Sequence, residues 1–456
     1  MSEIKKMKRI RKQWILAGIL FLFWIPWGIL CFPGNMPYDA GTSIAWFTGL
    51  DRSNVNNPYF QNILFGSFYS LGKGLGIPEF GVCLYCWLQM ILEAILLGHV
   101  IAYLSDKWAG KAAYILVAFY TLIPVFPLYA FMMGKDSNLA IGILWFIYLL
   151  LKSAGDREEF WAKKSNRIWI AITPAILSLL RNFAGWIPLI IAIVLLLIWR
   201  KKAGILPAAL SAVLLVIVSI AIPRIAGIPS VEIKEEMSMP LQTAAYYVQQ
   251  HEDEVTPEEK EIITSVVDWD MFTYGYNPNL ADRIKDVSTF TPETRAKFLG
   301  MWWGMFRKHP GTILEGWWKS IWVYFAPSDQ SPVKSHVFFG VSIDPELRAW
   351  LRLSEVAEGN YTAANIWNWA INVPVLRQLQ CIGLYSWIAV AMTLIALIFR
   401  KLRKFLPCCL MLIMVLVACM LGPVNGYYRY AYPMILSTPV VFTAMTGCFV
   451  KELKKA

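Results

Sequence analysis

Histidine and charged residues are scarce in this sequence, and the motifs of nucleotide-binding and zinc enzymes are absent. Charged residues make up 16% of the 456 residues, and there are four histidines, with neither an HExxH motif nor a paired-histidine spacing. The sequence has no P-loop, and no GxGxxG motif opens a helix after a strand. We therefore predict no zinc enzyme, assign no residue as a metal ligand, and expect no nucleotide bound by this chain.

Cysteine usage also points away from redox or metal chemistry. The spacing Cys83-x-x-Cys86 serves such chemistry in other settings, but here it lies inside an apolar run with no second pair. All eight cysteines lie in or at the edges of apolar runs, where a thiol packs as a small apolar group. We interpret them as packing residues.

Apolar residues dominate the sequence instead. The chain is 57% hydrophobic, has a mean hydropathy of +0.49 and contains 21 tryptophans, which is typical of a multi-pass membrane protein. The first apolar run follows a basic stretch but lacks a small-residue cleavage pattern, so we expect a retained span. We predict ten spans, at residues 14–31, 80–104, 112–132, 138–151, 168–181, 183–199, 203–222, 378–399, 405–421 and 431–449.

The basic residues predict the orientation, because short cytoplasmic loops retain lysine and arginine. With ten spans, six basic stretches fall on one side: the N-terminus, Lys107 with Lys111, 152–167, 200–202, 400–404 and 451–455. We therefore expect a multi-pass protein of the cell membrane with both termini in the cytoplasm. This bias and anionic lipid explain the net charge of +11, so no nucleic-acid partner is needed.

The predicted fold is all-α, with three parts. Residues 1–222 form an N-terminal transmembrane module with a first outer loop at 32–79, residues 223–377 a mostly helical extracytoplasmic domain, and residues 378–456 a C-terminal transmembrane module. The outer segment holds most of the acidic residues and no clear run of alternating strands. Thr256-Pro257-Glu258-Glu259 and Thr291-Pro292 predict helix starts, and Pro310 should end the second helix after Lys308.

A few charged residues sit at the predicted outer ends of the spans, where cations are normally sparse. They are Asp39, which follows the Pro and Gly residues after the first span, Lys135-Asp136, Arg181 and Arg429. The cations could be snorkelling anchors or could pair with aspartates to join helices. Asp39 and Asp136 could each cap a helix. Taken together, they indicate an anion-binding pocket.

Several short motifs give the chain a resemblance to a known superfamily. They are Pro33-Gly34 with Tyr38-Asp39, Asn57-Pro58-Tyr59, the segment from Leu71 to Gly76, Lys135-Asp136, Arg181-Asn182, Met239-Pro240-Leu241-Gln242 and the segment from Pro423 to Tyr430. Their arrangement resembles the GT-C membrane glycosyltransferases, and in particular a little-characterised bacterial branch. In the first loop many relatives carry a His-containing motif where this chain reads Asn56-Asn57-Pro58-Tyr59.

The resemblance implies interfacial helices in the first outer loop and transfer of a sugar from a polyprenyl-phosphate donor to an extracytoplasmic glycan, lipid or protein acceptor of the envelope. It makes Asp39 the general base of an inverting reaction, since a carboxylate can take a proton from the acceptor hydroxyl. Preplaced cations would bind the donor phosphate, and the remaining matched residues would contact substrate. The phosphate-binding residues implied are Lys135, Arg181 and Arg429, and the substrate contacts are Tyr38, Asn57, Asp136, Asn182 and Asn425.

Other functions remain open at this point. A flippase or transporter of lipid-linked sugars would need charges near the membrane midplane and often has internal repeats, and we find no convincing repeat. An inactive GT-C-like scaffold is favoured by the missing histidine. No spacing indicates a cofactor, and a need for a divalent ion such as Mg²⁺ or Mn²⁺ stays open.

Overall fold

The computed structural model describes residues 3–52, 56–182, 186–187, 190, 204–229, 231–327, 337–354 and 358–454. Over these ranges it is built from helices, with three isolated β-bridges in place of a sheet. The helices of the first half are α1 (Glu3–Leu30), α2 (Tyr38–Thr48), α3 (Tyr59–Gly74), α4 (Pro78–Leu104), η1 (Ser105–Ala109), η2 (Gly110–Tyr114), α5 (Ile115–Leu122), α6 (Val125–Ala130), α7 (Lys135–Gly155), α8 (Arg157–Ala162), α9 (Lys164–Leu180), α11 (Ile205–Val216), η4 (Ile217–Ala221) and α12 (Ile222–Ile225).

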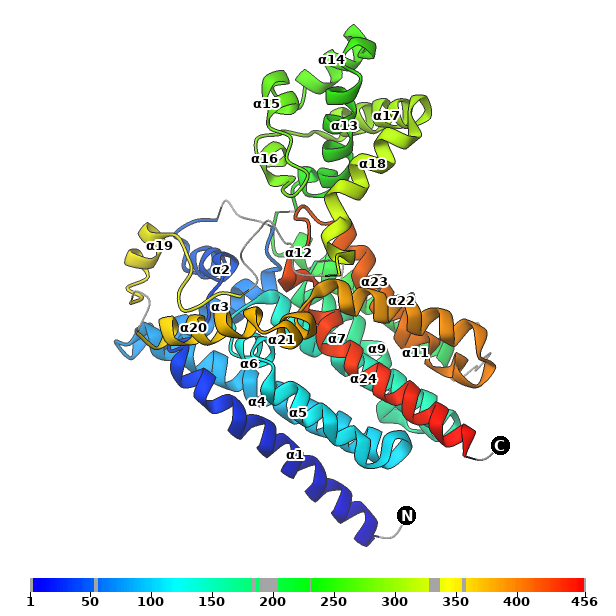
Figure 1. Cartoon of the computed structure of the whole chain (residues 1–456). Coiled ribbons are helices and arrows are strands. Elements are labelled where there is room, and N and C mark those ends of the chain that lie inside the picture. The colour runs from blue at the N-terminus through cyan, green and yellow to red at the C-terminus, as the bar shows by residue number, and fades with distance from the viewer. Residues whose placement is uncertain are drawn as a thin grey trace.

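The second half contains an outer bundle and then a return to apolar helices (Figure 1). Its helices are η5 (Ile233–Met237), α13 (Ser238–Gln250), η6 (Glu252–Glu254), α14 (Pro257–Thr264), α15 (Trp269–Tyr274), α16 (Asp282–Lys285), α17 (Pro292–Lys308), α18 (Pro310–Ile321), η7 (Trp322–Phe325), α19 (Pro345–Trp350), α20 (Glu358–Asn372), α21 (Pro374–Leu379), α22 (Ile382–Ile398), η8 (Arg400–Phe405), α23 (Leu406–Met420) and α24 (Tyr428–Leu453).

Six helical stretches of the described chain are long and apolar enough to cross a membrane. They are Arg9–Leu30, Pro78–Leu122, Lys135–Gly155, Ile205–Ile225, Arg400–Met420 and Tyr428–Leu453. Three of the remaining predicted spans overlap the shorter helices α5, α9 and α22. The predicted span 183–199 lies almost wholly outside the described residues. The count of ten spans therefore stays a prediction.

The long helices also carry apolar side chains on their outer surface. Leu22 on α1, Leu206 on α11 and Ile398 on α22 are 64–76% exposed, while the buried residues of α1 and α22 belong to one large apolar core. Water would disfavour so much exposed apolar surface, whereas lipid does not. The protein is thus an all-α, multi-pass membrane protein.

Basic residues from distant parts of the chain meet at one end of the membrane helices, the end where both termini lie (Figure 1). Lys12 Nζ lies 2.8 Å from an oxygen of Asp106, and Lys451 Nζ donates to the carbonyl of Lys107 at 2.6 Å. The fold therefore brings together three of the predicted basic stretches: the N-terminus, the loop of Lys107 and Lys111, and 451–455. That this end faces the cytoplasm stays a prediction.

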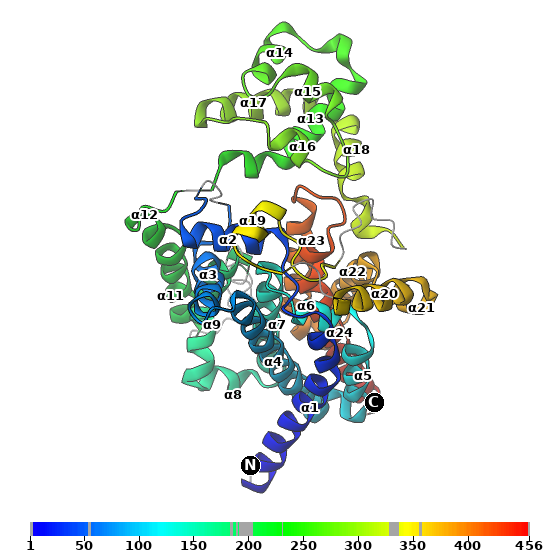
Figure 2. The same cartoon turned by 90° about the vertical axis from the view of Figure 1, so that its left-hand side faces the viewer.

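At the other end of the long axis, α13 to α18 form a separate bundle (Figures 1 and 2). It has its own apolar core of residues between Met237 and Ile313. The two helix starts predicted there are confirmed: Thr256 and Glu259 form a reciprocal capping box, and α17 begins at Pro292 and ends at Lys308.

The loop that follows α1 is held in place on two sides. The amide of Met133 donates to the carbonyl of Asn35 at 2.8 Å, and the amide of Met36 donates to the carbonyl of Gly340 at 2.9 Å. The buried side chain of Asn35 donates to the carbonyl of Leu128 at 3.1 Å. These bonds fix the start of α2, and therefore Asp39, against the start of α7.

Candidate functional site

A cavity of about 610 Å³ lies between the apolar helices and the outer bundle. The starts of α2, α7 and α24 and the end of α9 line it from the membrane side, which we call the floor. Segments η5 and α16 line it from the outer bundle, which we call the roof. The charged residues that line it are Asp39, Lys135, Arg181, Glu235, Glu236, Asp282, Lys285, Asp286 and Arg429.

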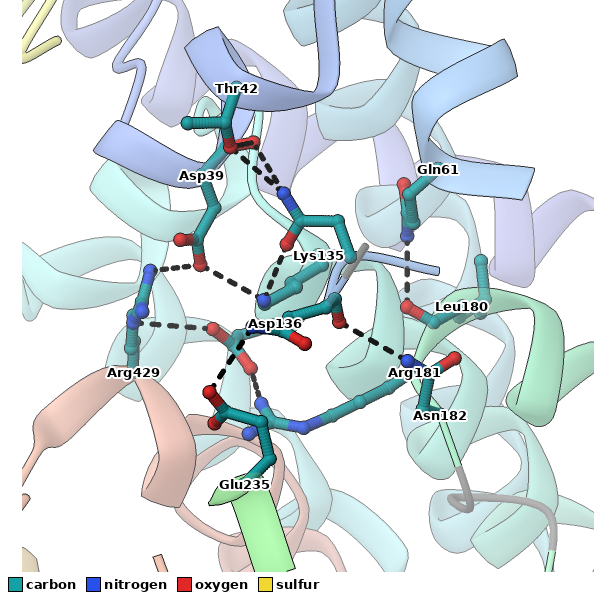
Figure 3. A network of polar contacts seen from close by, with 12 residues as sticks. Asp39, Thr42, Gln61, Lys135, Asp136, Leu180, Arg181, Asn182, Glu235 and Arg429 are labelled. Atoms are coloured by element: carbon teal, nitrogen blue, oxygen red, sulfur yellow. Dashed lines mark hydrogen bonds and ion pairs between the residues drawn. The ribbon is translucent and has the colours of Figure 1, made fainter. Parts of the chain in front are cut away.

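Asp39 is the centre of the floor (Figure 3). Its carboxylate oxygen Oδ2 lies 2.8 Å from Nη1 of Arg429 and 3.1 Å from Nζ of Lys135. Helix α2 begins at Tyr38 with Pro37 as its N-cap and no capping side chain. The interpretation of Asp39 as a helix cap is therefore wrong.

Asp136 forms a second carboxylate beside the first and is 3% exposed. It forms an ion pair with Nη1 of Arg181, and its Oδ2 lies 3.5 Å from Nε of Arg429. The N-cap of α7 is Gly134, with no side-chain capping bond, so Asp136 is not a cap either. Arg429 thus links the two aspartates, and Asp136 lies behind the cavity lining.

The floor contains a cluster of five charged side chains with three positive and two negative charges, and therefore a net charge of +1. They are Asp39, Lys135, Asp136, Arg181 and Arg429. Tyrosine rings of the 427–430 segment cover the cations: the guanidinium of Arg429 lies 4.6 Å from the ring of Tyr427, and that of Arg181 lies 4.5 Å from the ring of Tyr430. The face of an aromatic ring stabilises a cation without neutralising its charge. The cluster can therefore accept one more anionic group.

The cations also change the acidity of Asp39. Burial alone would raise the pKa of this carboxyl, but the charges of Arg429 and Lys135, with Arg181 farther away, outweigh burial and hold the pKa below its usual value. Asp39 is therefore ionised, and it is a weak proton acceptor while both cations stay bound to it.

Asn57 holds Asp39 and Lys135 in position. Its Oδ1 accepts from Nζ of Lys135 at 2.7 Å, and its Nδ2 donates to Oγ1 of Thr42 at 2.9 Å and to the backbone carbonyl of Asp39 at 3.3 Å. The side chain is 6% exposed. In the Asn56-Asn57-Pro58-Tyr59 motif of the first loop, the chain thus has an amide that positions the floor.

The other predicted contact residues divide into two groups. Tyr38 is 55% exposed and lines the cavity, and Asn182 lines it while its Nδ2 donates to the carbonyl of Asn56 at 3.2 Å. Asn425 is buried outside the cavity lining, where its side chain accepts from the amide of Val323 and donates to the carbonyl of Lys319. Asn425 shapes the turn before α24.

The roof was missed by sequence reasoning. Lys285 is 5% exposed, and its Nζ lies 2.8 Å from both Glu235 and Asp282, which joins η5 to α16. Burial would lower the pKa of Lys285, but these carboxylates raise it above its usual value. Glu235 also accepts from Nδ2 of Asn56 at 3.1 Å, which links the roof to the first outer loop. The acidic composition of the outer segment was the one available signal.

The sequence profile of a family of unknown function, DUF6020, matches residues 52–455. The chain belongs to this family. The match includes Lys135, Asp136, Arg181 and Arg429, whereas Tyr38 and Asp39 precede it. No curated protein and no solved structure matches the chain.

In this DUF6020 protein the floor already provides a cation for each aspartate. A metal ion bridging Asp39 and Asp136 would have to displace Arg429, which contacts both. In the described part of the chain, a trio of side chains close enough to share a metal occurs elsewhere, in the outer bundle. The floor is better suited to an anion.

Proposed function

We propose that this protein is an integral membrane glycosyltransferase of the GT-C type that transfers a sugar from a polyprenyl-phosphate donor to an acceptor of the cell envelope. The observation that carries the proposal is the grouping of Lys135, Arg181 and Arg429 around Asp39 in one cavity beside the membrane helices. A lipid-linked donor places its phosphate at such a depth, where the lipid ends and water begins.

The cations supply what the leaving group needs. As the bond between the anomeric carbon and the phosphate oxygen breaks, the electron pair stays with the phosphate, whose negative charge increases. Preplaced cations stabilise this charge most in a cavity with little water. Arg181 and Arg429 can each bind two phosphate oxygens, and Lys135 can act as a single point charge.

Donor binding would also activate Asp39. The ion pairs with Arg429 and Lys135 make the carboxylate a weak base. A phosphate that draws these cations away raises the basicity of Asp39 when it is needed. The acceptor hydroxyl then attacks the anomeric carbon from the face opposite the phosphate and gives its proton to Asp39, which inverts the anomeric centre.

The same pairing favours a second candidate, a scaffold that binds polyprenyl phosphate without catalysis. Through its two cations Asp39 joins α2 to α7 and α24, which is a structural role that needs no reaction. The two candidates differ in what the loss of the Asp39 carboxylate does, because a scaffold needs the cations and a transferase needs the carboxylate as well.

The test combines genetics with binding. Cells lacking the gene receive the native protein, Asp39→Asn or Asp270→Asn, and envelope glycans are profiled by mass spectrometry. Asp270 is an exposed aspartate of α15 outside the cavity lining. Purified proteins are then titrated with polyprenyl phosphate.

If the protein is a transferase, one sugar disappears from the glycan profile on deletion, returns with the native protein or Asp270→Asn, and stays absent with Asp39→Asn. The purified Asp39→Asn protein should still bind polyprenyl phosphate. Full restoration by Asp39→Asn would leave the scaffold as the explanation. An unchanged glycan profile on deletion, with no binding, would exclude both.

A further inference from the structure

The outer bundle brings together two of the four histidines of the chain with a glutamate. His251 follows α13, Glu254 ends η6, and His309 lies between α17 and α18. One ligand atom from each of the three residues lies within 4.8 Å of the other two. We propose that His251, Glu254 and His309 bind a divalent transition metal, and that this metal is zinc. The proposal is independent of the function proposed for the cavity.

Both imidazoles face the same carboxylate. Nδ1 of His251 lies 3.4 Å from Oε1 of Glu254, and Nε2 of His309 lies 2.8 Å from Oε2. The two rings are parallel, with centroids 4.0 Å apart, and the ring of Tyr247 packs beside them with its centroid 5.0 Å from that of His251. One carboxylate and two stacked rings therefore present three ligand atoms to one small volume.

Thr312 provides the partner that a metal-binding histidine usually has on its other nitrogen. Its Oγ1 lies 2.9 Å from Nε2 of His251. When Nε2 carries the proton and donates it to Thr312, the lone pair of Nδ1 faces Oε1 of Glu254. A cation between these two acceptors then joins them.

The surrounding charge and the ligand types favour zinc. Nζ of Lys308 is directed to Glu259 at 2.9 Å, so this lysine forms its short ion pair with a carboxylate outside the trio. Two histidines and one glutamate form a ligand set used for Zn²⁺, with water in the fourth position. Mg²⁺ and Ca²⁺ prefer oxygen ligands alone.

A metal here would tie the end of α13 to the junction of α17 and α18. Residues 251 and 309 are 58 positions apart, so the link closes a long stretch of chain. Because the unfolded chain has no preformed site, the free energy of metal binding adds to that of folding. The proposed role is therefore a clip that stiffens the outer bundle.

The test uses the full-length protein in detergent, purified with a tag that contains no histidine and stripped with a chelator. Zinc is added, excess is removed by dialysis, and the zinc content per chain is measured. Binding affinity is followed by titration, and the visible spectrum of added Co²⁺ reports on the ligands. The variants are His309→Gln, Thr312→Val and, as the matched control, Glu252→Gln, an exposed neighbour of the trio.

We expect about one zinc per native chain and per Glu252→Gln chain, and none for His309→Gln. Thr312→Val should weaken the affinity about 10-fold to 100-fold, as removal of such a partner typically does. Zinc should raise the melting temperature of the native protein and leave that of His309→Gln unchanged.

A native protein that retains no zinc would overturn the proposal, as would equal retention by His309→Gln and Glu252→Gln. If His309→Gln melts lower than the native protein even in chelator, the substitution has damaged the fold and its zinc content is not informative. The affinity of Thr312→Val for zinc and the Co²⁺ spectrum of the native protein then test the site. An unchanged affinity in Thr312→Val together with a spectrum lacking nitrogen ligation would then exclude the site.

Discussion

Arg429 is the residue on which the floor depends most. It is 9% exposed and contacts Asp39 at 2.8 Å and Asp136 at 3.5 Å, so it neutralises carboxylates from two different helices. A buried ion pair by itself adds little to stability, but removing one partner leaves a buried charge uncompensated. The cluster is therefore sensitive to single substitutions and tolerant of paired ones.

We expect Arg429→Gln to lower the free energy of unfolding by about 1.5–3 kcal/mol, because Asp39 then keeps only Lys135 and Asp136 keeps only Arg181 as a cationic partner. The double variant Asp39→Asn with Arg429→Gln should cost less than the sum of the two single variants, since one of those carboxylates is then absent. Thermal unfolding in detergent measures this, with Arg307→Gln on the exposed side of α17 as the control for charge. If the losses in unfolding free energy of the two single variants simply add up in the double variant, Asp39 and Arg429 are not paired.

The lowered pKa of Asp39 predicts a pH dependence of stability. The folded-state pKa lies below the unfolded value of about 3.9, so in acid the unfolded chain binds a proton that the folded chain does not. The contribution of Asp39 to stability is present above about pH 4 and is lost as the pH falls through the folded-state pKa. The difference in melting temperature between native protein and Asp39→Asn should therefore shrink on acidification, and a constant difference would count against the ion pairs.

At the scale of elements, helix α4 approaches α1 very closely at Gly98. A Cβ atom there would lie 2.6 Å from the backbone nitrogen of Ala17 and 2.8 Å from the carbonyl oxygen of Gln13. On the facing helix, a Cβ at Gly18 would meet nothing within 4 Å. The packing of α4 against α1 thus requires glycine at position 98 but not at position 18.

Gly98→Ala should destabilise the protein by about 1–3 kcal/mol, the usual cost of overpacking, because the clash is with backbone that cannot rotate away. Gly18→Ala is the matched control in the same helix pair and should change stability by less than about 1 kcal/mol. Melting temperatures in detergent distinguish them. Equal effects of the two substitutions would show that α1 and α4 do not meet as described.

For the whole molecule, the gathering of basic residues at one end predicts one orientation. If that end is cytoplasmic, a cysteine in place of exposed Thr264 on α14 should react with a membrane-impermeant thiol reagent in intact cells. A cysteine in place of exposed Lys164 at the start of α9 should react only after permeabilisation. The reverse pattern would place the outer bundle and the cavity in the cytoplasm and would remove the basis for an extracytoplasmic acceptor.

Local chemistry in the sequence determined the elements of this protein. Long apolar runs predicted the membrane helices α1, α4, α7, α23 and α24, because backbone groups in lipid must bond within the same segment. The pair Thr256 and Glu259 predicted the start of α14, because a capping box needs only four consecutive residues. The charges at predicted outer helix ends singled out Asp39, Lys135, Arg181 and Arg429, because such charges need partners.

Only the tertiary structure decided which of these residues meet. It joined Asp39 to Lys135 and Arg429, brought the roof residue Lys285 over the floor, and buried Asn425 in a turn away from the cavity. It also stacked His251 on His309, although the sequence shows no paired-histidine spacing. Contacts between residues far apart in the chain depend on how several helices pack at once, and no local pattern encodes that packing.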